Sequence, residues 1–150
     1  MEKNEHFQLD SRLSNDCIIL GDLDGQPVET TCLLLLMDNA DIPWFVIVPT
    51  GTTVIDIDEL PERHQLTMLK NMNDLSGFLK QHYSVDKINF ASIGNVVNQL
   101  HFHLVARTEQ DMAWPGVVWG VKAKNKYTQK QVEGLKCALE KNISNFNVNK

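Results

Sequence analysis

The stretch that decides the fold is Gly94-Asn-Val-Val-Asn-Gln-Leu-His-Phe-His-Leu-Val-Ala-Arg107, where polar and apolar residues alternate from Gln99 to His103. Successive side chains of a β-strand leave on opposite faces, so we expect a strand over residues 100–107. Gln99, His101 and His103 then share one face, while the apolar residues between them point into a hydrophobic core. The two imidazoles would lie side by side, with their Cα atoms about 6.5–7 Å apart.

Apolar and β-branched runs on both sides of this stretch predict further strands. The expected strands cover residues 17–20, 28–37, 44–48 and 87–93, and residues 7–14 form a short helix or irregular structure. Strands that follow one another with few helices between them favour an antiparallel sheet over a parallel one. We therefore expect an α+β fold with a sheet of about five strands, one long helix and a C-terminal helix.

Apolar residues at helical spacing predict the two helices. The long helix is expected over residues 61–83, and its buried face would consist of Leu66, Leu69, Met72, Leu75 and Leu79. The last helix is expected over residues 128–146, and its apolar side would consist of Val132, Leu135, Leu139 and Phe146.

Length and composition indicate one globular domain over residues 1–150. The 14 Lys and Arg against 19 Asp and Glu give a net charge of −5, which disfavours a nucleic-acid-binding protein. The three cysteines are far apart and form no CxxC pair, so a reducing compartment is expected. Residues 1–10 show no signal-peptide pattern, and the longest apolar run, residues 32–37, is too short to cross a membrane. We expect a cytoplasmic protein without a membrane partner.

The imidazole pair has three chemical interpretations. One ring could attack a phosphorus atom and form a phospho-histidine while the other binds the phosphate oxygens. Both rings could instead bind zinc, although no third ligand has a matching position, since His6, His64 and His82 show no spacing relation to the pair. The rings could also simply be solvated on an open sheet face. Chemistry at phosphorus requires both rings to border open space.

The residues just before the pair favour an anion site. Gly94 would let backbone amides approach a phosphate, and the side-chain amide of Asn95 can donate to a phosphate oxygen. Arg107, at the end of the predicted strand, would add positive charge or be a solvated edge residue.

Residues 94–105 resemble the signature of the histidine triad (HIT) superfamily, a Gly-containing loop followed by His-φ-His-φ-His-φ-φ. The resemblance extends to the hydrophobic strand that ends in Pro49 and to the helix between the two motifs. Residues 114–120, Trp-Pro-Gly-Val-Val-Trp-Gly, are similar to a bacterial branch with Gln in the first motif position. The similarity covers about residues 9–120.

The resemblance implies a nucleotide hydrolase or nucleotidyl transferase, commonly a homodimer, that needs no cofactor or metal. The substrate would be a nucleotide or a dinucleoside polyphosphate. The implied site has His101 as the nucleophile toward an α-phosphate, with His103, Asn95 and Gly94 at the phosphate and Gln99 helping to set the geometry. Alternatives are a nucleotide-binding protein with little or no activity, and a metal-binding His-x-His protein.

The nucleoside end of the implied site is less determined by the sequence. Asp38 and Asn39 lie near where family members hold the ribose hydroxyls, but both residues are also typical of a turn between strands. Trp114 and Trp119 would form a wall of the site, a dimer contact or a packed lid.

Two positions depart from the family pattern. Gln99 replaces the first histidine, but the nucleophilic ring is oriented partly by a backbone carbonyl near that position, which any residue supplies. Val96 stands where several branches have a Ser or Thr that assists the leaving group. Poor leaving groups such as amines would therefore react slowly.

Overall fold

The computed structural model describes residues 7–149, so His6 and the rest of residues 1–6 lie outside the described part. Three α-helices and six strands alternate with two short 3-10 turns. In chain order the elements are α1 (Ser11–Asp16), β1 (Cys17–Leu23), η1 (Val28–Thr30), β2 (Cys32–Met37), β3 (Trp44–Pro49), η2 (Ile57–Glu59), α2 (Glu62–His82), β4 (Lys87–Ala91), β5 (Phe102–Arg107), α3 (Gln129–Asn142) and β6 (Phe146–Val148).

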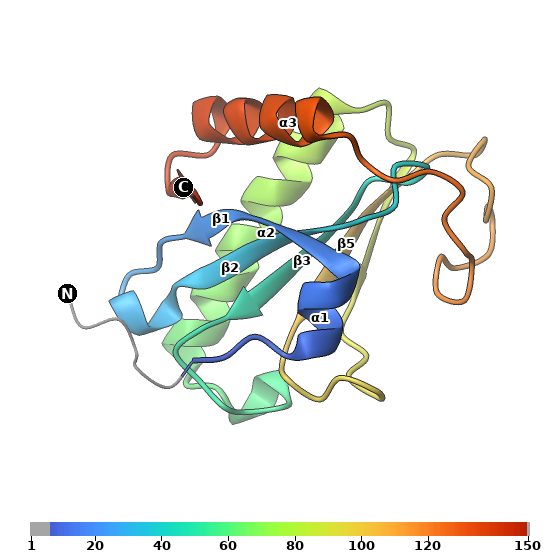
Figure 1. Ribbon diagram of the computed structural model, residues 1–150. Coiled ribbons are helices and arrows are strands. Elements are labelled where there is room, and N and C mark those ends of the chain that lie inside the picture. The colour runs from blue at the N-terminus through green and yellow to red at the C-terminus, as the bar shows by residue number, and fades with distance from the viewer. Residues whose placement is uncertain (1–6, 150) are drawn as a thin grey trace.

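One antiparallel sheet organises the chain, with the strand order β4-β5-β3-β2-β1-β6. Helix α2 crosses one face of the sheet, and α1 lies on the opposite face (Figure 1). The predicted α+β class with an antiparallel sheet is confirmed. The sheet has six strands rather than about five, because the last residues of the chain add β6 beside β1.

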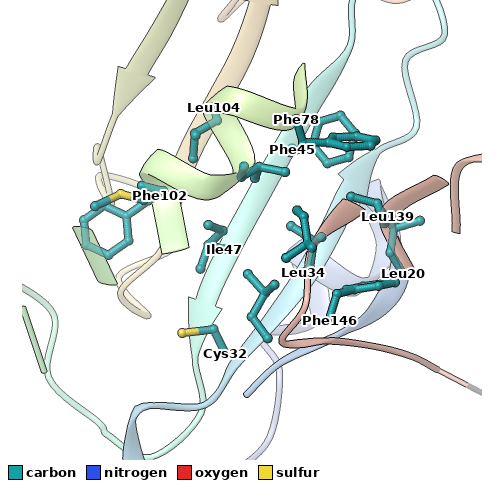
Figure 2. Close-up of a cluster of buried hydrophobic side chains, with 14 of the residues drawn as sticks. Leu20, Cys32, Leu34, Phe45, Ile47, Phe78, Phe102, Leu104, Leu139 and Phe146 are labelled. Carbon is teal, nitrogen blue, oxygen red and sulfur yellow. The ribbon is translucent and has the colours of Figure 1, made fainter. Parts of the chain in front are cut away.

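Alternation along the strands gives the sheet two buried faces. Phe102 and Leu104 of β5 enter the core beneath α2 and α3, together with Phe45 and Ile47 of the neighbouring strand β3 (Figure 2). The alternate residues Val46 of β3 and Val105 of β5 belong to a second core on the α1 side. The predicted assignment of Leu100, Phe102 and Leu104 to one apolar face is therefore confirmed.

The prediction for the buried face of the long helix is wrong at two positions. Leu66 and Leu69 are 60% and 51% exposed, and Met68 and Phe78 are buried in their place. Met72, Leu75 and Leu79 lie in the core as predicted. The spacing of 66 and 69 relative to 72 is helical, but these two residues lie on the flank of α2 that the sheet does not cover.

The last predicted helix extends too far. Helix α3 ends at Asn142, and Phe146 lies in β6, where its backbone pairs with Leu23 of β1. Its side chain still enters the same core as Leu135 and Leu139, which explains why its spacing looked helical. The predicted strand over residues 28–37 is likewise divided into η1 and β2.

Within residues 7–149, no helix is long and apolar enough to cross a bilayer.

Candidate active site

The ring of His101 is oriented by a backbone carbonyl. Its Nδ1 lies 2.7 Å from the carbonyl oxygen of Gln99. A carbonyl oxygen only accepts hydrogen bonds, so Nδ1 carries the proton and donates it to this oxygen. In the neutral ring, Nε2 then carries a free lone pair. His101 lies directly before β5, so this local contact sets the direction of its ring.

His103 is fixed in the opposite tautomer. The indole Nε1–H of Trp44, on the neighbouring strand β3, donates to His103 Nδ1 across 2.9 Å. An indole N–H only donates, so Nδ1 is the acceptor and the proton of the neutral ring is on Nε2. Burial lowers the pKa of His103 to about 4, with a smaller contribution from the nearby His101. His103 is therefore neutral near pH 7 and presents an N–H donor.

The two imidazoles lie side by side at the edge of a pocket. Their ring centroids are 4.9 Å apart, and each residue is only 5% exposed. Both line a pocket of about 680 Å³ on the α1 face of the sheet. The interpretation as two solvated rings on an open face is wrong, because Trp44 and the segments above the sheet enclose them. The requirement that both rings border open space is met.

The loop before β5 forms one wall of this pocket. Gly94, Asn95, Val96 and Val97 all line it. Gly94 has φ +69°, a conformation that side chains with a Cβ adopt at a cost, so glycine lets the loop turn here. The exposed Asn95 lines the same space as the two imidazoles. The structure thus brings Gly94 and Asn95 together with His101 and His103.

Asp38 and Asn39 follow β2 and line the same pocket. Asp38 Oδ1 accepts from the backbone N–H of Tyr127, and its Oδ2 lies 3.5 Å from Lys126 Nζ. The Asn39 Oδ1 accepts from the backbone N–H of Asp41, a turn contact, which leaves its amide nitrogen for other partners. These residues therefore form the turn that their composition suggested and also border the pocket.

The side chain of Gln99 points away from the two imidazoles. Its Oε1 accepts from the backbone N–H of Asp10, and its Nε2 donates to the carbonyl of Gln8. Only the Gln99 backbone carbonyl contacts His101. The amide side chain thus binds the N-terminal segment, and the carbonyl orients the nucleophile candidate.

The two predicted tryptophans have different surroundings. Trp119 lines the pocket and packs edge-on against His103, with ring centroids 5.3 Å apart, and against Trp44. Trp114 instead lies over the guanidinium of Arg107.

Arg107 is neither a pocket cation nor a solvated edge residue. Only 1% of its surface is exposed, and its Nε and Nη2 donate to the carboxylate of Asp111 at 2.7 and 3.0 Å. Further N–H groups donate to Asn89 Oδ1 and to the carbonyl of Gly116. Arg107 therefore fixes the loop after β5, which leads to Trp119.

Sequence reasoning missed several residues of the site, among them Trp44, Arg12 and Lys126. Trp44 was identified only as part of an apolar strand, and Arg12 and Lys126 carried no signal, although all three line the pocket. The strand alternation could have found Trp44, because Trp44 and His103 lie on the same face of two paired strands. Arg12 lies 84 residues before Val96, the residue of the pocket loop that it contacts. Lys126 lies in irregular structure between β5 and α3. No local sequence pattern marks either residue.

A zinc site at the pair lacks ligands. Within residues 7–149, no group of three or more His, Cys, Asp or Glu side chains is placed to hold a metal ion. His64 and His82 lie on α2, across the sheet from the pair. Structural zinc needs four ligands and catalytic zinc usually three from the protein, so the donor set does not fit.

Comparisons with known proteins agree with this geometry. The HIT domain family model matches residues 28–110. No curated protein matches the chain at a significant level. Its structure is similar to that of a histidine triad protein from Bradyrhizobium japonicum (34% identity, TM-score 0.82, covering 91% of this chain and 98% of that one). It is also similar to a histidine triad protein from Sinorhizobium meliloti (31% identity, TM-score 0.83, covering 92% of this chain and 98% of that one). A third similar structure is a histidine triad protein from Marinobacter aquaeolei (35% identity, TM-score 0.83, covering 94% of this chain and 98% of that one).

A two-imidazole pocket on an antiparallel sheet, a family match over more than half of the chain and three solved relatives above 30% identity lead to one conclusion: the chain belongs to the HIT family.

Proposed function

We propose that the chain is a nucleotide phosphoanhydride hydrolase or nucleotidyl transferase that works through a covalent nucleotidyl-histidine on His101. The observation that carries the proposal is the pair of opposite tautomers: Nε2 of His101 offers a lone pair, and Nε2 of His103 offers a proton. A nucleophile and a hydrogen-bond donor beside each other suit attack on phosphorus, because charge develops on the phosphate oxygens during the reaction.

The first step joins His101 to the nucleotide. Nε2 of His101 attacks the α-phosphorus, a P–N bond forms, and the bridging P–O bond breaks with its electron pair leaving on the departing phosphate. His103 donates its Nε2–H to an α-phosphate oxygen, and Asn95 and the Gly94 backbone bind the other oxygens. In hydrolysis, water then attacks the phosphorus, the P–N bond breaks, a nucleoside monophosphate leaves, and one proton is released as the neutral ring is restored. A transferase passes the nucleotidyl group to another acceptor.

The nucleoside occupies the other end of the pocket in this proposal. Asp38 accepts from a ribose hydroxyl, and Asn39 contributes its free amide nitrogen. The edge contact of Trp119 with His103 makes Trp119 a wall between the phosphate end and the base.

The reaction is tested by trapping the intermediate. The protein is mixed with a dinucleoside polyphosphate for a single turnover and quenched without acid, because a phosphoramidate is acid-labile. Mass spectrometry should find a nucleotidyl adduct on His101, and His101→Gly should form none. His82→Gln, which changes an exposed histidine on α2, is the matched control and should react normally. Saturable AMP or GMP binding without product would instead indicate an inactive nucleotide-binding protein, and normal turnover by His101→Gly would refute the assignment.

We also propose that two copies associate along β4. This strand is one edge of the sheet, and Phe90 on it is exposed and pairs in register with Leu104, so its side chain lies on the α2 side. The exposed Leu66 and Leu69 of α2 also lie on this side of the sheet. The opposite flank of α2 is oriented toward β6, since Asn71 there bonds to Asn145. An unpaired strand edge beside exposed leucines suits a second copy.

Sedimentation velocity tests this association. Leu69→Lys should convert a dimer to a monomer. Val117→Lys places the same charge on an exposed apolar residue of the loop after β5 and should leave the dimer intact. A wild-type chain that sediments as a monomer at all accessible concentrations would contradict the proposal.

A further inference from the structure

The N-terminal segment, residues 8–16, borders the site through its second half. Arg12, Leu13, Asn15 and Asp16 line the pocket of the two imidazoles. Within residues 7–149, Arg12 and Lys126 are the only lysine or arginine residues that line it. Lys126 lies beside Asp38, at the end that the proposed function gives to the nucleoside. Arg12 lies against the loop that carries Gly94 and Asn95, since its Nη1 donates to the Val96 carbonyl of that loop.

Hydrogen bonds link Gln99, Asp10, Arg12 and Val96, and the backbone from Val96 to Gln99 closes the ring. The nucleophile candidate His101 is attached to this ring through the Gln99 carbonyl. The Gln99 carbonyl accepts from His101 Nδ1, and Gln99 Oε1 accepts from the N–H of Asp10. The Asp10 carboxylate accepts from Nε and Nη2 of Arg12 at 3.1 and 2.9 Å. Nη1 of Arg12 then donates to the carbonyl of Val96 at 2.6 Å, three residues before Gln99. The guanidinium is thus held beside the phosphate loop by contacts on two of its sides.

This position leaves Arg12 able to bind an anion. The three bonds use three of the five N–H groups of the guanidinium, and the side chain is 52% exposed. Bidentate binding of one planar edge by Asp10 fixes its orientation, so little side-chain entropy remains to be lost when a ligand binds. The interaction with Arg12 holds the pKa of Asp10 at about 2, so the carboxylate stays charged and the contact persists over the working pH range.

We propose that Arg12 binds the phosphate group of the departing part of the substrate, beyond the attacked α-phosphate, and that Gln99 is the positioning residue that holds it there. The inference rests on the proposed function and deepens it: the preferred substrates are nucleotides whose leaving group is itself a phosphate. As the bridging P–O bond breaks, negative charge develops on the β-phosphate oxygen, and the free N–H groups of Arg12 stabilise it.

Gln99 suits this task because a side-chain amide both accepts and donates. Its Oε1 accepts from the backbone N–H of Asp10, and its Nε2 donates to the backbone carbonyl of Gln8. The side chain thus binds one backbone donor and one backbone acceptor of the N-terminal segment. A carboxylate at the same position would keep the first bond and place an oxygen against the Gln8 carbonyl. The amide side chain of Gln99, which stands where the family pattern has an imidazole, therefore binds the segment that carries Arg12.

Two substrates with different leaving groups test the role of Arg12. The leaving group of diadenosine tetraphosphate begins with a phosphate. The leaving group of the p-nitrophenyl ester of AMP is p-nitrophenolate, which carries no phosphate. Arg12→Gln should lower kcat/KM for the first by about 10- to 100-fold, the usual effect of a lost charge-assisted hydrogen bond, and for the second by less than about 3-fold. Arg63→Gln removes the same charge from an exposed residue of α2 and should change neither value. Equal losses with both substrates would show that Arg12 only supports the loop, and would overturn the inference.

Gln99 is tested through the same ratio. Gln99→Glu should reduce the preference for the phosphate leaving group as Arg12→Gln does, and the double variant should show no further reduction. Asn98→Asp makes the same chemical change at the neighbouring exposed residue and should keep the preference. Additive effects of Arg12→Gln and Gln99→Glu would overturn the positioning role.

Binding measurements separate the inference from the proposed function. Isothermal titration calorimetry with ADP and AMP should show tighter binding of ADP in the wild type, and Arg12→Gln should remove this difference. If the protein forms no adduct and no product but shows this Arg12-dependent preference, the proposed function fails, and only the binding of the β-phosphate by Arg12 stands. If an adduct forms on His101 but Arg12→Gln leaves both the preference and the kcat/KM ratio unchanged, the inference fails and the function stands.

Discussion

The indole N–H of Trp44 donates to Nδ1 of His103 across 2.9 Å, and this one contact determines which nitrogen of His103 faces the pocket with a proton. The tautomer is thus set by a strand on which sequence reasoning saw only hydrophobicity. Removing the donor while keeping an apolar ring is the most direct test of its importance.

Trp44→Phe should destabilise the protein by about 1–3 kcal/mol, because it leaves the buried Nδ1 of His103 without a partner. It should also slow formation of the His101 adduct, since His103 is no longer restricted to the Nε2–H tautomer. Urea denaturation measures the stability, and ¹⁵N NMR of the imidazole nitrogens reports the tautomer. Trp114→Phe, a tryptophan over Arg107 rather than in the pocket, is the control for the tautomer. An Nδ1–H tautomer of His103 in the wild type would contradict the assignment.

Acid should destabilise the fold through His103. Its pKa in the folded chain is about 4, against about 6.5 in an unfolded chain, so the unfolded state binds more protons between these values. Protonation of His103 therefore does not change the free energy of unfolding above about pH 6.5. As the pH falls from there toward 4, the free energy of unfolding decreases by about 3 kcal/mol at most. His103→Gln, which can still accept from Trp44, should show a smaller decrease when urea midpoints are measured from pH 7.5 to 4. Identical slopes for the two proteins would contradict the burial of a neutral ring.

The ion pair between Arg107 and Asp111 should be essential for stability. Asp111→Asn leaves the buried guanidinium without a countercharge and should cost about 3–5 kcal/mol. Lys70 and Asp74 on α2 form an exposed pair with the same sequence spacing, and Asp74→Asn there should change stability by less than about 1 kcal/mol. Thermal or chemical denaturation compares the two variants. Similar small losses at both sites would mean that the loop after β5 does not depend on Arg107.

Gly94→Ala tests the turn of the loop of residues 94–97, which lines the pocket. A Cβ at this position would meet the Val97 carbonyl oxygen only at an ordinary 3.5 Å, so the expected loss of about 1–2 kcal/mol comes from the positive φ alone. Nucleotide affinity should fall as the loop relaxes. Gly77→Ala in the interior of α2 meets no atom within 4 Å and should instead stabilise the protein by about 0.5–1 kcal/mol. Unchanged stability in Gly94→Ala would show that the loop tolerates another conformation.

The parts of the fold that follow a strict two-residue period could be predicted from the sequence. His101, Phe102, His103 and Leu104 lie on the faces that alternation assigns to them, because a strand permits no other arrangement once one face is apolar. Helical periodicity was less decisive at Leu66 and Leu69. An apolar stripe on a helix does not reveal how much of its width the sheet covers, and these residues belong to an uncovered flank.

The polar contacts of the site could not be predicted, because they join distant segments. Gln99 bonds to residues about 90 positions earlier, and Arg12 reaches the carbonyl of Val96. No local pattern marks such pairs, since amides and guanidinium groups are equally common on solvated surfaces. Arg107 shows the same limit: only the structure reveals that the loop after β5 folds back to bury it.

The double use of β5 has a consequence for how this gene can change. Its odd-numbered and even-numbered residues serve opposite faces, so a codon inserted or deleted next to His103 would turn the side chains on one side of the change to the wrong face of the sheet. Chemistry and foldability would be lost in the same event. Diversification by insertion is thus confined to the connections, and within β5 only substitution remains open to evolution.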